Sequence, residues 1–236
     1  KFNKKVFVFV MTLQIMFAVA LSIGSNLYFF EDGSLAALSY ATPVDPYQEL
    51  TVALSQGRFD TNGTNPQYSD EEENIQKLNG LDNVYEPAQR EGISYRWDRA
   101  FYKGKYYCYF GIVPVIFIYL PVYLLTGNLI NTKILALLLV IATMIMMTKL
   151  VMTIVGKWKK SVNTWVLIVT TIGFINSSFL IYSINGSRFY EVASVSALLC
   201  TLIGMDFLLN TFTKKGVKKK YLMTGALFMA LAVGCR

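Results

Sequence analysis

The 236-residue chain contains no histidine and only three cysteines. The absence of histidine excludes a serine–histidine–aspartate triad and a histidine zinc site within this sequence. Cys108, Cys200 and Cys235 show neither a disulfide framework nor the spacing of metal ligands. Charge is also scarce, since 16% of the residues are charged, whereas about a quarter is usual in a soluble domain.

Long apolar runs replace the missing charge. A run of 18 or more apolar residues is typical of a transmembrane helix, because about 20 residues are needed to cross about 30 Å of hydrocarbon. Residues 6–30 form the first such run, which contains no charged residue and follows three lysines. A signal peptide is the alternative, but this run is too long for its apolar region, so we favour an uncleaved helix. Further transmembrane helices are predicted over residues 134–155, 165–184, 192–212 and from 221 onward.

A polar segment separates the first apolar run from the others. All but two of the 15 acidic residues lie within residues 31–109. Residues 45–59 have spaced apolar positions and predict a short amphipathic helix, whereas residues 62–83 are rich in Asn, Asp, Glu and Gly and predict a loop. Few apolar residues lie in the middle of this segment, which disfavours an independent core.

The apolar stretch 110–126 differs from the predicted spans. It has 17 residues and contains Pro114 and Pro121. Proline removes a backbone donor and disrupts a helix, so this stretch is a poor spanning helix. We interpret it as a juxtamembrane segment that stays at the outer face.

The distribution of lysine predicts the topology. If residues 110–126 do not cross the membrane, eleven lysines without an acidic neighbour fall on one side. Cytoplasmic loops are enriched in Lys and Arg, so that side is the cytoplasmic one. The net charge of +7 therefore reflects membrane topology, and we expect no binding of nucleic acid. The lysines are Lys1, Lys4, Lys5, Lys157, Lys159, Lys160, Lys214, Lys215, Lys218, Lys219 and Lys220.

The predicted organisation has three parts. Residues 1–30 form a cytoplasmic N-terminus and the first transmembrane helix, and residues 31–127 form an external loop. Residues 128–236 form four further transmembrane helices, the last truncated. The sequence starts without methionine and stops inside an apolar run, so we interpret it as a fragment of a longer protein.

Several motifs occur along the chain in a fixed order. They read DPYQEL at 45–50, GRF at 57–59, WDRAFYKGKYY at 97–107, YFG at 109–111, LLTG at 124–127 and YSINGSRFYE at 182–191. In this order they resemble the GT-C class of polyprenyl-phosphate-dependent glycosyltransferases, in the branch of aminoarabinose transferases and protein mannosyltransferases. The resemblance covers nearly the whole chain, as the N-terminal part of the membrane domain of that family.

The resemblance implies a fold and a location. The expected fold is an all-α polytopic membrane protein, a GT-C-like helical bundle whose large first external loop carries juxtamembrane helices. The expected location is the bacterial plasma membrane.

The chemistry of such a transferase requires few groups. The leaving group is a phosphate, so the site needs a base for the acceptor hydroxyl and positive charge near the phosphate. Asp45 is the candidate base, and the alternative role for Asp45 is an N-cap of the helix that follows. Glu49 lies one turn later on the same helix face and is the second candidate catalytic residue.

Further site residues follow from the resemblance and from charge. Glu191 matches an acidic residue of the family in an external turn, and Arg188 in the same turn is expected to contact donor phosphate; a solvated turn is the alternative. Five cations precede the juxtamembrane segment among aromatic residues, and for most of them we favour a belt facing lipid headgroups. From this region we select Arg90, Asp98 and Lys105 as candidate phosphate or sugar contacts. The five cations are Arg90, Arg96, Arg99, Lys103 and Lys105.

Partners and rival functions complete the prediction. The expected partners are a polyprenyl-phosphate-linked sugar, the lipid bilayer and an extracytoplasmic acceptor such as a glycolipid, wall polymer or protein. No ligand spacing is diagnostic of a metal, although a divalent cation (Mg or Mn) fits an acid-rich loop. Asp206, inside a predicted span, is assigned to bundle packing rather than to the site. The rival functions are a polytopic transporter or lipid flippase, and a membrane-anchored binding or assembly protein.

Overall fold

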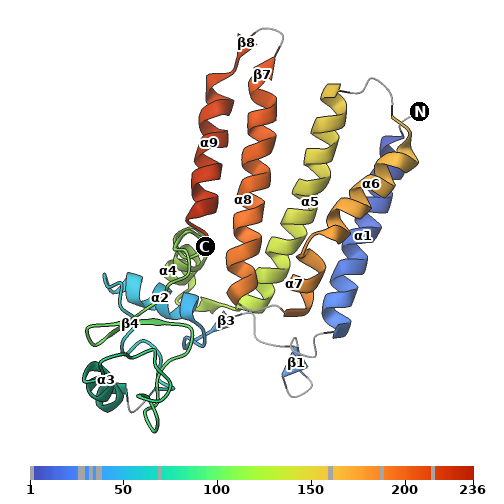
Figure 1. Ribbon diagram of the computed structural model, residues 1–236. Helices are drawn as coiled ribbons and strands as arrows, with labels where there is room; N and C mark the ends of the chain where they lie inside the picture. Colours follow the sequence, from blue (N-terminus) through green and yellow to red (C-terminus); the bar gives the residue numbers. More distant parts are fainter. Residues whose placement is uncertain are drawn as a thin grey trace. The chain divides into compact units, whose positions relative to one another are not determined.

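The computed structural model, shown in Figure 1, describes residues 3–25, 30–31, 34–35, 39–68, 71–158, 162–186, 189–213 and 216–236. This part of the chain is mostly helical. It divides into two compact units, which we call the helical unit (Lys1–Ala37 and Thr132–Arg236) and the polar unit (Leu38–Asn131).

The helical unit contains six α-helices and two short hairpins among the described residues. The hairpins pair β1 (Phe30–Glu31) with β2 (Ser34–Leu35) and β7 (Phe212–Thr213) with β8 (Gly216–Val217). The helices are α1 (Lys4–Ser25), α5 (Thr132–Trp158), α6 (Thr164–Ser177), α7 (Leu180–Gly186), α8 (Phe189–Thr211) and α9 (Lys219–Val233).

Three helices of this unit are long and apolar enough to cross a membrane. They are Lys4–Leu21 within α1, Thr132–Lys157 within α5, and α8, Phe189–Thr211. These helices confirm three of the apolar runs predicted to be membrane helices, over residues 6–30, 134–155 and 192–212. The last helix, α9, has 15 described residues and is shorter than these three.

The predicted helix over residues 165–184 is wrong in one respect, because the structure divides it into α6 and α7. At the break, Ser178 adopts an extended conformation (φ −80°, ψ 161°). Its backbone N–H donates to the carbonyl of Ile175, and its hydroxyl accepts from the N–H of Leu180. Serine hydroxyls compete with the helical ladder for backbone groups, which accounts for the interruption. The 14 residues of α6 rise about 21 Å, less than the thickness of the hydrocarbon core.

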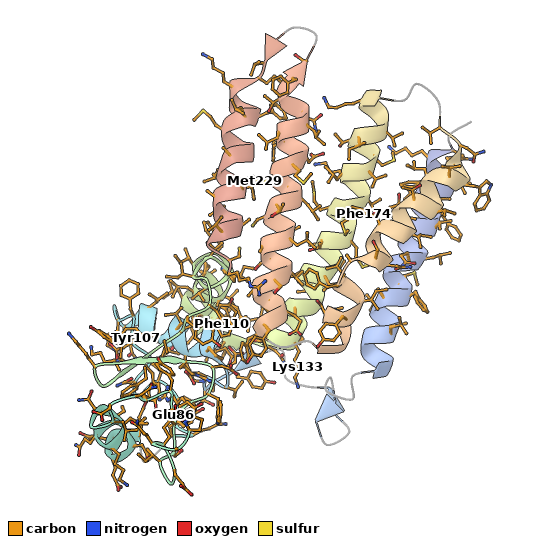
Figure 2. The ribbon with its side chains drawn as sticks, viewed as in Figure 1. Glu86, Tyr107, Phe110, Lys133, Phe174 and Met229 are labelled. Atoms are coloured by element: carbon orange, nitrogen blue, oxygen red, sulfur yellow. The ribbon has the colours of Figure 1, made fainter. Side chains whose placement is uncertain are left out.

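Helices α8 and α9 pack closely through glycine. A Cβ atom added at Gly225 would lie 2.7 Å from Cγ of Leu208, and one added at Gly204 would lie 3.1 Å from the carbonyl oxygen of Gly225. Met229, labelled in Figure 2, lies beside Gly204, where the same added Cβ would be 3.2 Å from Cγ of Met229. Small residues that let two backbones approach are the usual contact between transmembrane helices.

Lysine gathers at one end of the helical unit. The backbone N–H of Asn3 donates to Oγ1 of Thr164 at 2.7 Å, which brings the start of α1 beside the start of α6. Nζ of Lys157 lies 3.5 Å from the carbonyl oxygen of Phe212, which brings the end of α5 beside the end of α8. Near the first residues of α1, Phe7 and Met11 pack in one cluster with Val151 and Val155 from the last turns of α5. Helices α1 and α5 therefore run in opposite directions, and α1 ends at the end of the unit where α5 begins. The described lysines at the first end are Lys4, Lys5, Lys157, Lys218, Lys219 and Lys220.

The polar unit combines short helices with two-stranded ladders. Strand β3 (Ser39–Tyr40) pairs with β6 (Leu129–Ile130), so both ends of the unit meet. Strands β4 (Ala100–Tyr102) and β5 (Lys105–Tyr107) form a hairpin whose two turn residues, Lys103 and Gly104, have φ of 47° and 74°. Such a turn needs positive φ at both positions, which glycine supplies without strain. The helices are α2 (Pro46–Ser55), α3 (Glu71–Asn79), the π-helix η2 (Val115–Tyr119) and α4 (Leu120–Thr126).

The sequence predictions for this unit are partly correct. Helix α2 confirms the predicted amphipathic helix over residues 45–59. The predicted loop over residues 62–83 is wrong at α3, whose first turn holds Glu71, Glu72 and Glu73. Acidic residues there favour the helix N-terminus, and Lys77 pairs with Glu73 one turn later at 2.6 Å. The predicted lack of an independent core is also wrong, because Leu78, Phe101 and Tyr106 form a buried cluster.

The two prolines of the juxtamembrane stretch are accommodated by a π-turn. Pro114 precedes η2, and the N–H of Leu120 donates to the carbonyl of Val115, five residues earlier. This wider turn fits the start of α4, where Pro121 lacks a donor. The apolar helix Val115–Thr126 remains shorter than a spanning helix. Its Val115 and Tyr119 side chains are buried, whereas Leu125 near its C-terminal end is 86% exposed.

Candidate functional site

Helix α2 positions both candidate acids. Asp45 is its N-cap, and Oδ1 accepts hydrogen bonds from the backbone N–H groups of Tyr47 (2.9 Å) and Gln48 (3.1 Å). Pro46 occupies the first turn, where its missing N–H costs nothing. Asp45 therefore has the N-cap role that the sequence offered as the alternative to catalysis. These bonds also hold the carboxylate in one orientation.

The aromatic ring of Tyr47 attaches α2 to the juxtamembrane helix. It stacks on Tyr119 with ring centroids 5.6 Å apart and packs against Phe110 at 5.8 Å. All three residues lie in the polar unit. The position of Asp45 is consequently tied to η2 as well as to α2.

Glu49 lies at the centre of a buried ion-pair network. It is 0% exposed, and the guanidinium of Arg99 binds it edge-on, with Nη2 2.7 Å from Oε1 and Nε 3.0 Å from Oε2. Nδ2 of Asn65 also donates to Oε1 at 2.9 Å, and Nη1 of Arg96 lies 3.4 Å from Oε2. Both carboxylate oxygens are therefore engaged by cations or amides. This arrangement suits a group that orders neighbouring residues better than a group that takes a proton.

Arg96 links this network to a second carboxylate. It is 1% exposed, and its Nη1 donates to the carbonyl oxygen of Thr61 at 3.0 Å. Its Nη2 lies 2.7 Å from Oε1 of Glu71, whose Oε2 accepts from the N–H of Gly63. Two arginines and two glutamates thus balance in charge, as a buried network must to offset the cost of desolvation. We call Glu49, Asn65, Glu71, Arg96 and Arg99 the Glu49 cluster.

Two pKa shifts place Asp45 in the same electrostatic neighbourhood. Burial lowers the pKa of Arg99, but the hydrogen bonds and charge of Glu49 and the charge of Asp45 outweigh burial and raise it overall. Burial raises the pKa of the Cys108 thiol to about 12, and the charges of Asp45 and Glu49 add to the rise. The Cys108 thiol is therefore neutral at physiological pH and is no nucleophile.

The other predicted contacts of the polar unit have separate surroundings. The Cζ atom of Arg90 lies 3.9 Å from the ring centroid of Tyr95 and 5.6 Å from that of Trp97. Asp98 has a positive φ of 59° and accepts from the hydroxyl of Tyr109 at 3.3 Å. Burial and the adjacent Asp98 raise the pKa of that hydroxyl. Lys105 is half-exposed and pairs with Asp60 at 3.2 Å.

The external turn predicted between two spans is only partly described. Glu191 occupies the first turn of α8 in the helical unit and is 9% exposed. A carboxylate is favoured there by the helix dipole. Arg188 lies outside the described residues. Within the described chain, no group of three or more His, Cys, Asp or Glu side chains could hold a metal ion.

Asp206 has a partner inside the helical unit. Its Oδ2 lies 3.0 Å from Nζ of Lys149 on α5, and its Oδ1 accepts from the hydroxyl of Thr153 at 2.6 Å. The buried carboxylate thus joins α8 to α5, which agrees with a role in bundle packing. No protein-family model, curated protein or solved structure matches this chain.

Proposed function

We propose that this chain belongs to a membrane glycosyltransferase that moves a sugar from a polyprenyl-phosphate donor to an acceptor outside the cytoplasm. The observation that carries the proposal is Asp45, a carboxylate fixed as the N-cap of α2 one turn before Glu49. In this proposal Asp45 takes the proton of the acceptor hydroxyl, and the phosphate departs as a stable anion.

The surroundings of Asp45 support an ordered site. Glu49 and Arg99 hold the first turns of α2 in place, because both carboxylate oxygens of Glu49 accept from guanidinium nitrogens of Arg99. A catalytic group must be held within about half an ångström of its productive position. Glu49 therefore enters the proposal as a positioning residue, and Asp45 alone as the base.

The helical unit supports a site on one side of a membrane. Because α1 ends where α5 begins, the chain leaves and re-enters this unit at the end opposite to the described lysines. With those lysines in the cytoplasm, we propose that the connection between α1 and α5, which includes Asp45, is extracytoplasmic, on the same side as the phosphate of an outward-facing lipid donor. Asp98 and Lys105, which lie in the polar unit with Asp45, are the proposed donor contacts. The enclosing membrane is the bacterial plasma membrane.

A labelled donor tests this proposal. Full-length protein in liposomes is incubated with a radiolabelled polyprenyl-phosphate sugar and a cell-envelope extract as acceptor. Label that appears in the acceptor supports the transferase. Label that crosses the bilayer but stays on the polyprenyl carrier identifies a transporter or flippase instead.

One observation favours a second function, a membrane-anchored binding protein. The polar unit has its own buried core at Leu78, Phe101 and Tyr106, as an independently folding recognition module has. In the same assay such a protein would neither transfer nor translocate the label. Retention of envelope material by the immobilised protein would then support the binding function.

A further inference from the structure

Two adjoining hollows lie on the polar unit and share a wall. One has a volume of about 90 Å³ and the other about 360 Å³, and both are lined by Ser94 and Tyr95. We call the two together the Tyr95 groove. The smaller lobe is completed by Gln67, Tyr68, Glu71, Asn74, Arg96 and Tyr106, and the larger by Pro87, Arg90, Ile93 and Trp97.

The larger lobe presents a cation between aromatic rings. Arg90 lies over Tyr95, and the ring centroids of Tyr95 and Trp97 are 4.7 Å apart. Trp97 is 69% exposed, so its ring is open to a ligand. Nε and Nη1 of Arg90 are buried and make no hydrogen bond, and in the described chain no carboxylate pairs with this guanidinium. An aromatic platform beside an unneutralised guanidinium fits a ring-shaped ligand that carries an anionic group.

The smaller lobe presents donors and an acceptor side by side. Nε of Arg96 is buried and makes no hydrogen bond, whereas Nη2 of Arg96 and Oε1 of Glu71 form an ion pair 2.7 Å apart. The Arg96 guanidinium also lies over the ring of Tyr68, with Cζ 4.3 Å from its centroid. A hydroxyl group both accepts and donates, so one hydroxyl satisfies Arg96 Nε and Glu71 Oε1 together. The side chain of Gln67 also lines this lobe.

We propose that the Tyr95 groove binds an acidic glycan, with a sugar ring against Trp97 and Tyr95 and its carboxylate on Arg90. A hydroxyl of the adjoining sugar accepts from Nε of Arg96 and donates to Oε1 of Glu71, beside their ion pair. Two other ligand classes fit less well. A neutral glycan supplies no anion to Arg90, and a simple anion supplies neither a ring for Tyr95 and Trp97 nor hydroxyls for the smaller lobe. As the acceptor site of a transferase the groove rests on the proposed function, but binding itself requires no transfer.

A matched pair of ligands tests this inference on the full chain in nanodiscs. Methyl β-glucopyranosiduronate and methyl β-glucopyranoside differ in whether C6 is a carboxylate, and their binding is measured by saturation-transfer NMR titration. We expect the uronide to bind about tenfold more tightly, as one charge-assisted contact provides. Arg90→Gln should bring the two affinities together, and Trp97→Ala should abolish both. Trp165→Ala, which removes a comparably exposed tryptophan (65%) from α6, is the control and should change neither.

Each result decides the inference. No saturable binding of either ligand, equal affinities for both, or binding that survives Trp97→Ala would overturn it. Asp45→Asn should leave uronide binding intact while sugar transfer is lost. An unaltered protein that binds the uronide but transfers no sugar contradicts the proposed function alone. A protein that transfers sugar but does not bind the uronide contradicts the groove alone.

Discussion

Arg99 binds Glu49 through two parallel contacts, 2.7 Å from Nη2 to Oε1 and 3.0 Å from Nε to Oε2. The two residues are 50 positions apart, so this pair fixes the start of the β4–β5 region against α2. Paired contacts of this kind orient both groups as well as attract them. The Glu49–Arg99 pair therefore also fixes the helix turn that begins at Asp45.

Removing the charge of Glu49 should destabilise the polar unit. Glu49→Gln leaves Arg99 buried without a carboxylate and Arg96 with Glu71 alone, and breaking a buried pair in this way costs about 3–5 kcal/mol. Glu72→Gln, on the exposed face of α3, is the control and should change stability by about 0.5 kcal/mol or less. Denaturant unfolding followed by limited proteolysis of residues 38–131 measures the difference. Equal stability of the two variants would show that the pair contributes nothing.

The Cys108 thiol should resist alkylation across physiological pH. Burial raises its pKa from 9.0 to about 12, so at pH 8 its thiolate fraction is about a thousandfold lower than that of an ordinary thiol. Since the folded pKa is raised, the associated stability is complete below about pH 9 and is lost as the pH rises toward 12. Site-resolved mass spectrometry after iodoacetamide treatment measures the rate at Cys108. Rapid labelling at pH 8 in the folded protein would contradict the raised pKa, and Glu49→Gln should increase the rate.

The effects of substitutions at Lys149 and Asp206 on thermal stability should not be additive. Lys149→Met leaves the buried Asp206 carboxylate with only the hydroxyl of Thr153 as its side-chain partner across α5, and should lower the midpoint of thermal unfolding in detergent. Adding Asp206→Asn should restore most of the loss, because Asn is neutral and still accepts from Thr153. A double variant no more stable than Lys149→Met would mean that the ion pair is incidental.

The two sides of the membrane should be distinguishable by labelling. Glu91→Cys in the polar unit should react with a membrane-impermeant maleimide in intact cells, whereas Lys219→Cys at the start of α9 should react only after the membrane is opened. Both positions are exposed, so burial does not explain a difference. Reaction of both residues from the same side would mean that residues 110–126 cross the membrane, against the topology predicted from lysine.

Local features of the structure were predictable from sequence, and distant pairings were not. Helix α2 follows from Asp45, Pro46 and spaced apolar positions, all within a few residues of one another. The break at Ser178 lies inside an apolar run, where composition alone does not reveal that hydroxyls terminate the helix.

The Glu49 cluster shows the same limit. Arg96 and Arg99 were predicted to belong to a belt facing lipid headgroups, and this is wrong, because both are buried in ion pairs with Glu49. Only the fold brings them to Glu49, across 47 and 50 positions of sequence. Five cations in one segment were the available signal, and this signal does not specify which of the five are buried.

The central claim is that Asp45 is the base for sugar transfer, and Asp45→Asn in the full-length protein tests it most directly. Asn is as good an N-cap as Asp, so the fold should be retained, whereas Asp45→Ala should cost about 1 kcal/mol of stability. With equal amounts of folded protein, the rate of transfer from a labelled polyprenyl-phosphate sugar should fall about 100-fold or more in Asp45→Asn. A folded Asp45→Asn protein that transfers sugar at the unaltered rate would contradict the account.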